Sequence, residues 1–335
     1  MWWVAPLRNA CGMFACLSSA ELSAAGLSSH QLRIAERCCL RRVRRGVYVV
    51  TSVCDEPTHR FIADIGAAAG TTLPCESAGA MKRNEDLHIL VRSYVDDCPD
   101  GAAFSHRSAL IIHGLPIPYF DNGAPLCVEF VHPEFGVRRS SAHIRKRPLD
   151  GNTEVVNDFR VTTLPQTLLD VARDYPLAFS VAAVDEALRR KLISIREFAD
   201  YCAHNPVRTR QGRVDAVIAN ADARRESVAE SIAAVRFVEY SIAGFEPQVV
   251  VRDEKGDFVA RTDFANPKAH VVAEFDGAGK YYLDGADPKR AFELERRREY
   301  SLRNLGFQVF RITWKDLFRG DLFLRIKDTV KRRSR

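Results

Sequence analysis

Several features are missing from this chain of 335 residues, and each absence excludes a class of protein. No apolar run approaches the ~20 residues that a membrane-spanning helix needs. The nine cysteines are odd in number, irregularly spaced and without a C-x-x-C pair, so neither a zinc finger nor a disulfide scaffold is expected. Arg8 interrupts the apolar start that a secretion signal would need. We therefore expect no membrane association, and a cytoplasmic protein with reduced, mostly buried thiols.

The chain also has no internal repeat and no low-complexity linker. Its hydrophobic fraction of 46% and charged fraction of 27% are ordinary for globular proteins, so a packed core is expected. The length predicts two or three domains. The net charge of +6 is compatible with binding to nucleic acid but does not establish it.

The first segment predicts two short helices followed by a β-hairpin. Ser18 and Glu21 have the spacing of a capping box, and Gly26 ends the helix that this box begins. Ser28 can cap a second helix that runs to about Cys39. Two β-prone arms over residues 40–50 flank an Arg-Arg-Gly turn. Helix, turn, helix and hairpin is the order of a winged helix, which we expect over residues 14–54. Because recognisable structure is expected to begin just after Met13, this residue is an alternative to Met1 as the start of translation.

This segment is also rich in arginine. Six arginines lie between Arg33 and Arg45, and Glu36 alone opposes them, so the strip can neutralise phosphates. The second helix would place its first residues at base edges, and the hairpin would reach the backbone or a minor groove. The expected DNA-binding residues are Ser29, His30, Gln31, Arg33, Arg41, Arg42, Arg44 and Arg45. The alternatives are a solvated basic face or a hairpin that docks a protein.

The string Arg44-Arg45-Gly46-Val47-Tyr48 that ends this segment resembles the winged-helix domain of AbiEi-family antitoxins. The resemblance covers residues 14–52. It implies binding of an operator in double-stranded DNA, repression of transcription, and a possible toxin partner protein.

Residues 55–220 predict a middle domain of mixed α/β type. A helix is expected over residues 102–113, strands over 126–131 and 161–163, and helices from Pro165 and over 178–191. The strings Ser105–Ala109 and His113–Pro116 resemble the segment after the winged helix in actinobacterial-type proteins of this architecture. No chemistry is assigned to them.

Residues 225–335 predict a third domain with the element order α-β-β-β-α-β. The expected helices span 226–241 and 288–304, and the expected strands span 248–251, 258–264, 270–275 and 307–313. The basic residues at the end of the chain are expected to fray.

Acidic residues gather near the ends of the middle strands of this domain. Asp263 and Glu274 could face each other and hold Mg²⁺, which prefers carboxylate oxygens and supports phosphodiester hydrolysis. Asp276 shares a face with Glu274, and Glu230 could approach from the helix. Lys280 or Arg261 could stabilise the developing charge. The alternative is that these acids are solvated residues at strand ends.

This order of elements and acids resembles the PD-(D/E)xK nuclease superfamily and, more narrowly, the Vsr-like endonucleases. The matching residues are Arg261–Phe264, Val271–Gly277, Arg298 to Gly306 and Val309–Trp314, with Ser227 and Glu230 on the opening helix. The resemblance implies a restriction-endonuclease-like fold with a metal site at Asp263 and Glu274. The superfamily places Lys two residues after the Glu, where this chain has Asp276, so fold is better supported than activity.

We thus expect an α/β (α+β multidomain) protein with a winged helix, a middle domain and a restriction-endonuclease-like domain. The first functional hypothesis is a DNA-binding, antitoxin-like transcriptional regulator that carries a nuclease-type fold. The second is an active Mg²⁺-dependent DNA endonuclease in which Asp263, Glu274, Asp276, Lys280 and Glu230 are catalytic. The third is a toxin-neutralising interaction protein without catalysis.

Overall fold

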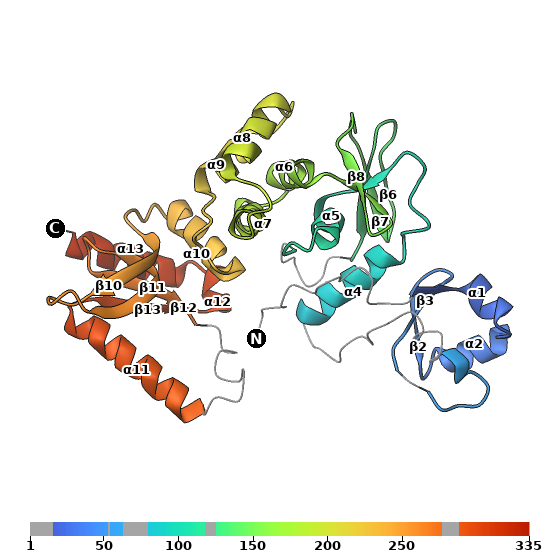
Figure 1. Ribbon diagram of the computed structural model, residues 1–335, viewed down its shortest axis with the longest axis horizontal. Helices are drawn as coiled ribbons and strands as arrows, with labels where there is room; N and C mark the ends of the chain where they lie inside the picture. Colours follow the sequence, from blue (N-terminus) through green and yellow to red (C-terminus); the bar gives the residue numbers. More distant parts are fainter. Residues whose placement is uncertain (1–15, 53, 63–79, 118–124, 277–287, 335) are drawn as a thin grey trace. The chain divides into compact units, whose positions relative to one another are not determined.

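The computed structural model describes residues 16–52, 54–62, 80–117, 125–276 and 288–334. The chain divides into two compact units, Ala5–Val171 and Ala172–Arg335, which are described separately (Figure 1). Both units combine helices with a sheet, which gives the general α/β class that the sequence predicts. In the described ranges no helix has both the length and the apolar character to cross a membrane.

The first unit opens with two helices and a hairpin, in the predicted order. The elements are β1 (Cys16–Ser18), α1 (Ser19–Ala24), α2 (Ser29–Ala35), β2 (Leu40–Arg44) and β3 (Val47–Val50), and the strands form a sheet in the order β1-β3-β2. Ser18 and Ser28 each form a capping box, with Glu21 and Gln31 respectively. Gly46 has a φ of +77° in the hairpin turn, a conformation that favours glycine.

Helix α2 is shorter than expected, because it ends at Ala35 rather than near Cys39. The N–H groups of Arg37 and Cys38 donate to carbonyls three residues back, those of Ile34 and Ala35. Residues 36–39 therefore form tight turns that lead into β2.

The rest of the first unit is built on a six-stranded mixed sheet with the order β6-β7-β5-β4-β9-β8. Its elements are α4 (Ala80–Arg92), β4 (Ala103–Phe104), α5 (His106–Ile112), β5 (Val128–His132), β6 (Val137–Arg138), β7 (Ala142–Lys146), β8 (Thr153–Val156) and β9 (Phe159–Thr162). Leu87 and Leu90 of α4 pack with Phe130 and Phe159 of the sheet.

The prediction of one helix over residues 102–113 is wrong in its first part. Ala103 and Phe104 form β4, where Phe104 pairs with Phe130 on one side and Val161 on the other. The helix starts only at His106, which has a φ of +51°. Pairing with two distant strands overrides the local helical preference.

The second unit combines helices with a four-stranded sheet. Helix α6 (Leu164–Asp174) lies at the division between the units, and α7 (Leu177–Arg189), α8 (Ile195–His204) and α9 (Gln211–Asn220) come next in the chain. The remaining elements are α10 (Val228–Glu239), β10 (Glu246–Arg252), β11 (Phe258–Asn266), β12 (Val271–Phe275), α11 (Pro288–Asn304), β13 (Gln308–Ile312), α12 (Trp314–Leu317) and α13 (Asp321–Arg333). From α10 to β13 the order is α-β-β-β-α-β, as the sequence predicts.

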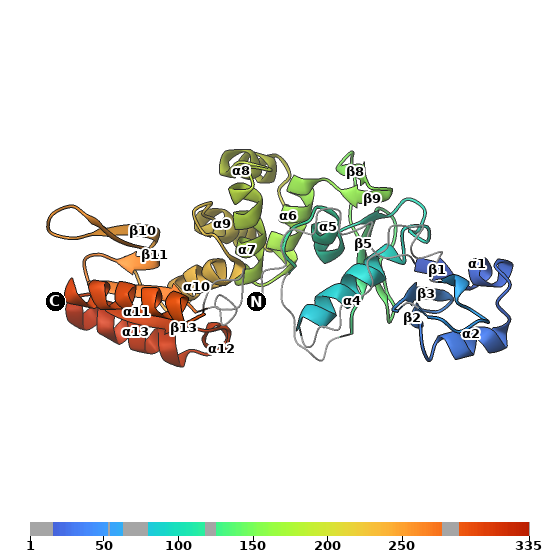
Figure 2. The same ribbon diagram turned by 60° about the horizontal axis from the view of Figure 1, so that its bottom comes forward.

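The four strands lie in the order β10-β11-β12-β13, and β12 and β13 are parallel. Leu302 of α11 packs with Ala265 and Val272 on one face of the sheet. On the other face, Phe237 of α10 contacts Phe264 of the sheet and Phe323 of α13. Helices therefore cover both faces, with α11 and α13 on opposite sides of the strands (Figure 1), and Figure 2 shows the same unit turned by 60°.

The end of the chain is helical rather than frayed. Helix α13 continues through Arg333, whose Nε donates to the carbonyl of Ala269 at 2.8 Å and whose Nη2 donates to the carbonyl of Gly306. These contacts connect the last turn of α13 to the turn before β12 and to the turn before β13.

Candidate functional site

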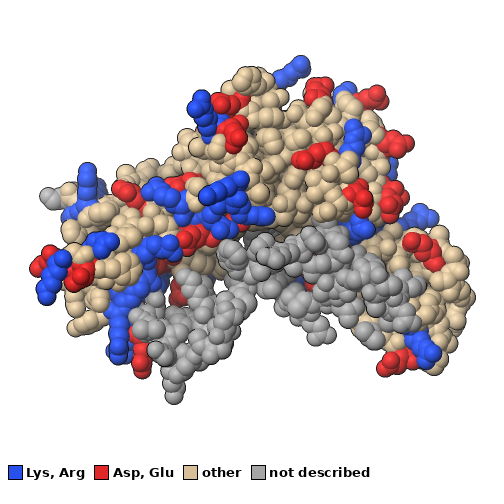
Figure 3. All heavy atoms as spheres, in the orientation of Figure 1, with Lys and Arg blue, Asp and Glu red and all other residues tan. Residues whose placement is uncertain are grey.

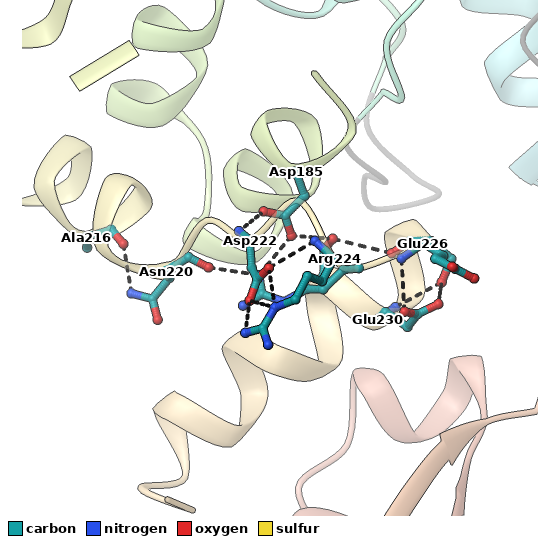
Figure 4. Close-up of polar contacts among 10 residues, drawn as sticks. Asp185, Ala216, Asn220, Asp222, Arg224, Glu226 and Glu230 are labelled. Carbon is teal, nitrogen blue, oxygen red and sulfur yellow. Dashed lines mark hydrogen bonds and ion pairs between the residues drawn. The ribbon is translucent and has the colours of Figure 1, made fainter. Parts of the chain in front are cut away.

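The acidic site of the second unit begins at the first turn of α10. Ser227 is the N-cap residue, and its hydroxyl accepts from the N–H of Glu230. The Glu230 carboxylate accepts in turn from the Ser227 hydroxyl at 2.9 Å, from the N–H of Glu226 at 3.0 Å and from the Gln248 amide at 2.9 Å. Figure 4 shows this turn of the helix. Glu230 is only 5% exposed, and its orientation is fixed by these three donors.

A second buried carboxylate supports the start of α10 from α7. Asp185 accepts from the N–H of Asp222 at 2.7 Å, from Nη1 of Arg225 at 2.8 Å and from the Ser231 hydroxyl at 2.7 Å (Figure 4). Burial raises the pKa of Asp185, although the Arg225 charge acts to lower it. This network ties the segment before α10 to α7 and so positions Glu230.

Glu230 and Asp263 lie close enough to interact electrostatically. Burial raises the pKa of Glu230, and the negative charge of Asp263 raises it further. Asp263 is half-buried on β11, and its Oδ2 accepts from the N–H of Phe275 at 2.8 Å. Asp263 on the sheet thus acts on Glu230 of the helix, and a shared site for the two acids stays a prediction.

Asp263 and Glu274 lie one position beyond the last pair of the β11–β12 ladder. Phe264 pairs with Ala273, so the register continued by one position sets Asp263 opposite Glu274. Residues that face each other across an antiparallel pair direct their side chains to the same face of the sheet. The two acids therefore share one face.

Glu274 is paired with two arginines that the sequence pattern does not identify as partners. Its Oε1 forms an ion pair with Nη2 of Arg298 from α11, and its Oε2 lies 2.9 Å from Nη1 of Arg311 on β13. Arg311 also contacts Glu299 at 3.1 Å, and Nη2 of Arg298 donates to the carbonyl of Arg261. Glu274 is 2% exposed, so the two guanidinium groups replace the water that its charge has lost.

This arrangement does not fit Mg²⁺. Both oxygens of Glu274 face guanidinium groups, whereas a bound Mg²⁺ needs free carboxylate oxygens and room for water. Among the described residues, the acids of the second unit do not form a group of three ligands close enough for one ion. Asp276 is half-buried, and its N–H donates to the carbonyl of Ile312. Lys280 lies outside the described residues.

The candidate DNA interface in the first unit has a different character. Ser29, His30 and Arg33 of α2 are exposed, and so are Arg42 and Arg45 of the β2–β3 hairpin. Gln31 is half-buried, and its side chain caps the start of α2 by accepting from the N–H of Ser28 at 2.9 Å. Five of the expected DNA-binding residues are thus accessible at the surface, and one has a structural role.

Arg41 and Arg44 are used within the protein instead. Arg41 forms an ion pair with Asp86 of α4. Arg44 pairs with Asp97, donates to the Ser93 hydroxyl at 3.1 Å and stacks over the Tyr94 ring at 4.3 Å from its centre. Its side chain is only 16% exposed. These two arginines attach the hairpin to α4 and its C-terminal turn, and their part in binding DNA stays a prediction.

The second unit does not present a purely basic surface on the face that Figure 3 shows, where Lys and Arg side chains are interspersed with Asp and Glu. Exposed arginines of α11 include Arg296, Arg297 and Arg303, and Arg303 pairs with Glu299 at 2.6 Å. Mixed charges of this kind repel DNA less than an acidic face but attract it less than a basic one.

A cluster of cysteine and histidine ligands in the first unit was not expected from the sequence. No zinc site is predicted there because no C-x-x-C pair is present. The structure instead brings Cys38, Cys39, Cys54 and His59 together. The hairpin itself was the signal that could have revealed the cluster, because Cys39 immediately precedes it and Cys54 lies soon after it.

Comparison of the chain with protein-family models, with curated proteins and with solved structures finds no match in any of the three.

Proposed function

We propose that this chain is a cytoplasmic DNA-binding protein, an antitoxin-like regulator of transcription that binds double-stranded DNA through α2 and the β2–β3 hairpin. The observation that carries the proposal is the exposure of Ser29, His30 and Arg33 on the first turns of α2, together with Arg42 and Arg45 on the hairpin. In a winged helix these are the positions that contact bases and phosphates.

Local packing supports this role. Both helices have capping boxes, so the start of α2 is well defined without using its exposed side chains. Arg41 and Arg44 attach the hairpin to α4, which holds the exposed Arg42 and Arg45 on a fixed support. A rigid support reduces the entropy lost on binding.

The second unit, in this proposal, has the core of a restriction-endonuclease-like fold with its acidic site closed. The α-β-β-β-α-β order and the facing pair Asp263 and Glu274 favour that fold. The ion pairs of Arg298 and Arg311 with Glu274 favour a site closed to a metal ion.

The DNA-binding proposal is tested by fluorescence anisotropy with labelled duplexes that cover the chain's own upstream region. We expect Arg42→Ala plus Arg45→Ala to weaken binding at least about 10-fold, because two phosphate contacts are lost. The control is Arg196→Ala plus Arg208→Ala, which removes the same charge from two exposed positions of the second unit. If both double variants bound DNA with the same affinity as the unchanged protein, the hairpin would not be part of the DNA interface.

A Mg²⁺-dependent DNA endonuclease is the second candidate, and the electrostatic interaction of Glu230 with Asp263 favours it. Plasmid incubated with Mg²⁺ or Mn²⁺ separates the two proposals. If the acidic site is closed to a metal ion, we expect the unchanged protein to nick the plasmid no more than Asp263→Ala does. Nicking that disappears in both Asp263→Ala and Glu274→Ala would instead establish the endonuclease.

A further inference from the structure

Three thiols and one imidazole meet where α2, the β2–β3 hairpin and the turn after it come together. Cys38 and Cys39 lie in the turn before β2, and Cys54 and His59 come after β3. Their ligand atoms all lie within 4.8 Å of one another. This Cys3His cluster is the one group of three or more metal-ligand side chains at such distances in the described part of the chain.

The distances match a tetrahedral metal site. Zn–S bonds of ~2.3 Å and Zn–N bonds of ~2.05 Å separate two sulfurs by ~3.8 Å and a sulfur from a nitrogen by ~3.6 Å. The Sγ atoms of Cys38 and Cys54 are 3.8 Å apart. Nδ1 of His59 lies 3.5 Å from the Sγ of Cys39 and 3.6 Å from that of Cys54. These three distances have the dimensions of a coordination shell. The Sγ of Cys38 lies 3.8 Å from Nε2 of His59, so a small turn of this side chain would direct all three sulfurs to an ion at Nδ1.

The backbone holds the two halves of the cluster together. Leu40 pairs with Val50, so the residues just before β2 meet those just after β3. The N–H of Thr51 donates to the carbonyl of Cys39 at 2.8 Å, and the Ser52 hydroxyl donates to that of Cys38 at 2.9 Å. The carbonyl of His59 accepts from the N–H of Ile62 at 3.1 Å. The ligands are thus positioned by the fold and not by chance contacts of loose side chains.

We propose that Cys38, Cys39, Cys54 and His59 bind one Zn²⁺ as a structural site that joins the winged helix to the segment after it. Thiolate and imidazole ligands select Zn²⁺ over Mg²⁺ or Ca²⁺, which prefer oxygen. All four ligands come from the protein, which leaves no open position for substrate, as in structural zinc sites. The site is independent of the acids of the second unit and of the proposed DNA binding.

The need for a metal arises from the size of this part of the fold. Its core is formed by a few side chains, among them Leu22, Leu27 and Ile62, with Cys39 inside it and Cys54 against it. A metal site adds stability to a core of this size. Cys39 and His59 are 1% and 0% exposed, so an ion bound there would lie at the edge of the core and add its binding energy to folding.

The competing use of the same atoms is a disulfide between Cys38 and Cys54. A disulfide would leave Cys39 and His59 without a chemical role, although Nδ1 of His59 lies 3.5 Å from the Sγ of Cys39 and 3.6 Å from that of Cys54. The two uses can be distinguished by experiment. A protein with the Cys38–Cys54 disulfide would contain no metal at this place, whereas a protein with the zinc site would contain both cysteines in the reduced form.

The test measures zinc in the full-length protein after purification under reducing conditions. We expect about one zinc per chain by elemental analysis, and Co²⁺ exchanged into the protein to give a tetrahedral spectrum with thiolate charge-transfer bands. Cys54→Ser should raise the dissociation constant for Zn²⁺ at least about 100-fold, more than the loss of a residue that only orients a ligand usually costs. Cys98→Ser, a half-buried cysteine outside the cluster, is the matched control and should keep full zinc content.

A second variant and a measurement on the unchanged protein keep the test decisive. Should Cys54→Ser fail to fold, Cys38→Ser replaces the exposed ligand and should weaken the metal without disturbing the core. The Co²⁺ spectrum of the unchanged protein also decides independently of any variant. The proposal would be overturned if the reduced protein took up neither Zn²⁺ nor Co²⁺ when each is supplied. It would also be overturned if Cys98→Ser lost as much zinc as Cys54→Ser, or if the reduced preparation contained a Cys38–Cys54 disulfide.

Discussion

Three buried carboxylates of the second unit have specific partners. Asp185 and Glu230 each accept three hydrogen bonds, and Glu274 faces two arginines. Removal of one partner from such a buried group leaves its charge or its lone pairs unsatisfied, which costs more than the pair itself contributes. These residues therefore hold elements together whether or not the acidic site has chemistry.

His88 on α4 makes the stability of the first unit depend on pH. Burial lowers its pKa from 6.5 to about 4. A histidine with a lowered pKa contributes stability that is complete above pH 6.5 and is lost as the pH falls toward 4. At pH 5 the loss reaches up to about 2 kcal/mol.

We expect His88→Phe to reduce this loss, because phenylalanine keeps the aromatic volume and does not titrate. Urea unfolding at pH 7.5 and pH 5 measures the difference. His30→Ala, an exposed histidine, serves as the control and should leave the pH dependence unchanged. An identical fall in stability for His88→Phe and the unchanged protein would assign the effect to other groups.

The sequence predicts the roles of some residues better than those of others. The reason is the separation along the chain between a residue and its partners. The acids Asp263 and Glu274 stand next to recognisable strands, so a local pattern finds them. Their partners Arg298 and Arg311 belong to α11 and β13 and meet Glu274 only through the crossover connection. The contacts of Arg44 escape the sequence pattern for the same reason, because Ser93 and Asp97 reach it from the C-terminal turn of α4 and beyond.

At the scale of elements, local signals set the helix starts. Ser18 and Ser28 are N-cap residues at the predicted positions, since a cap depends on three or four neighbouring residues. Strands that depend on distant partners are harder to predict. Ala103 and Phe104 form β4 only because β5 and β9 lie on either side.

The cap of α2 provides a test at this scale. Ser28→Ala removes the hydroxyl that accepts from the N–H of Gln31, and we expect a loss of about 1 kcal/mol in stability. Ser29→Ala, one position later, is the matched control because Ser29 is the first helical residue and is exposed. Chemical denaturation that shows equal losses in both variants would argue against the cap.

At the scale of the whole molecule, the two units differ in the functional residues that they carry. The first unit has exposed basic residues on its helix-and-hairpin segment and a Cys3His cluster at the base of that segment. The second has the element order α-β-β-β-α-β from α10 to β13, and arginines pair with the buried Glu274 of its acidic site. DNA binding is proposed for the first unit, so it should survive changes to the acids of the second.

The dependence of DNA affinity on salt is the most direct test of that claim. Each phosphate contact contributes a slope of about −0.9 to the logarithm of the binding constant against that of the salt concentration. We predict that Arg42→Ala plus Arg45→Ala makes this slope less steep by about 2, whereas Asp263→Ala leaves it unchanged. A slope that is the same in the arginine variant and the unchanged protein would contradict binding through the winged helix.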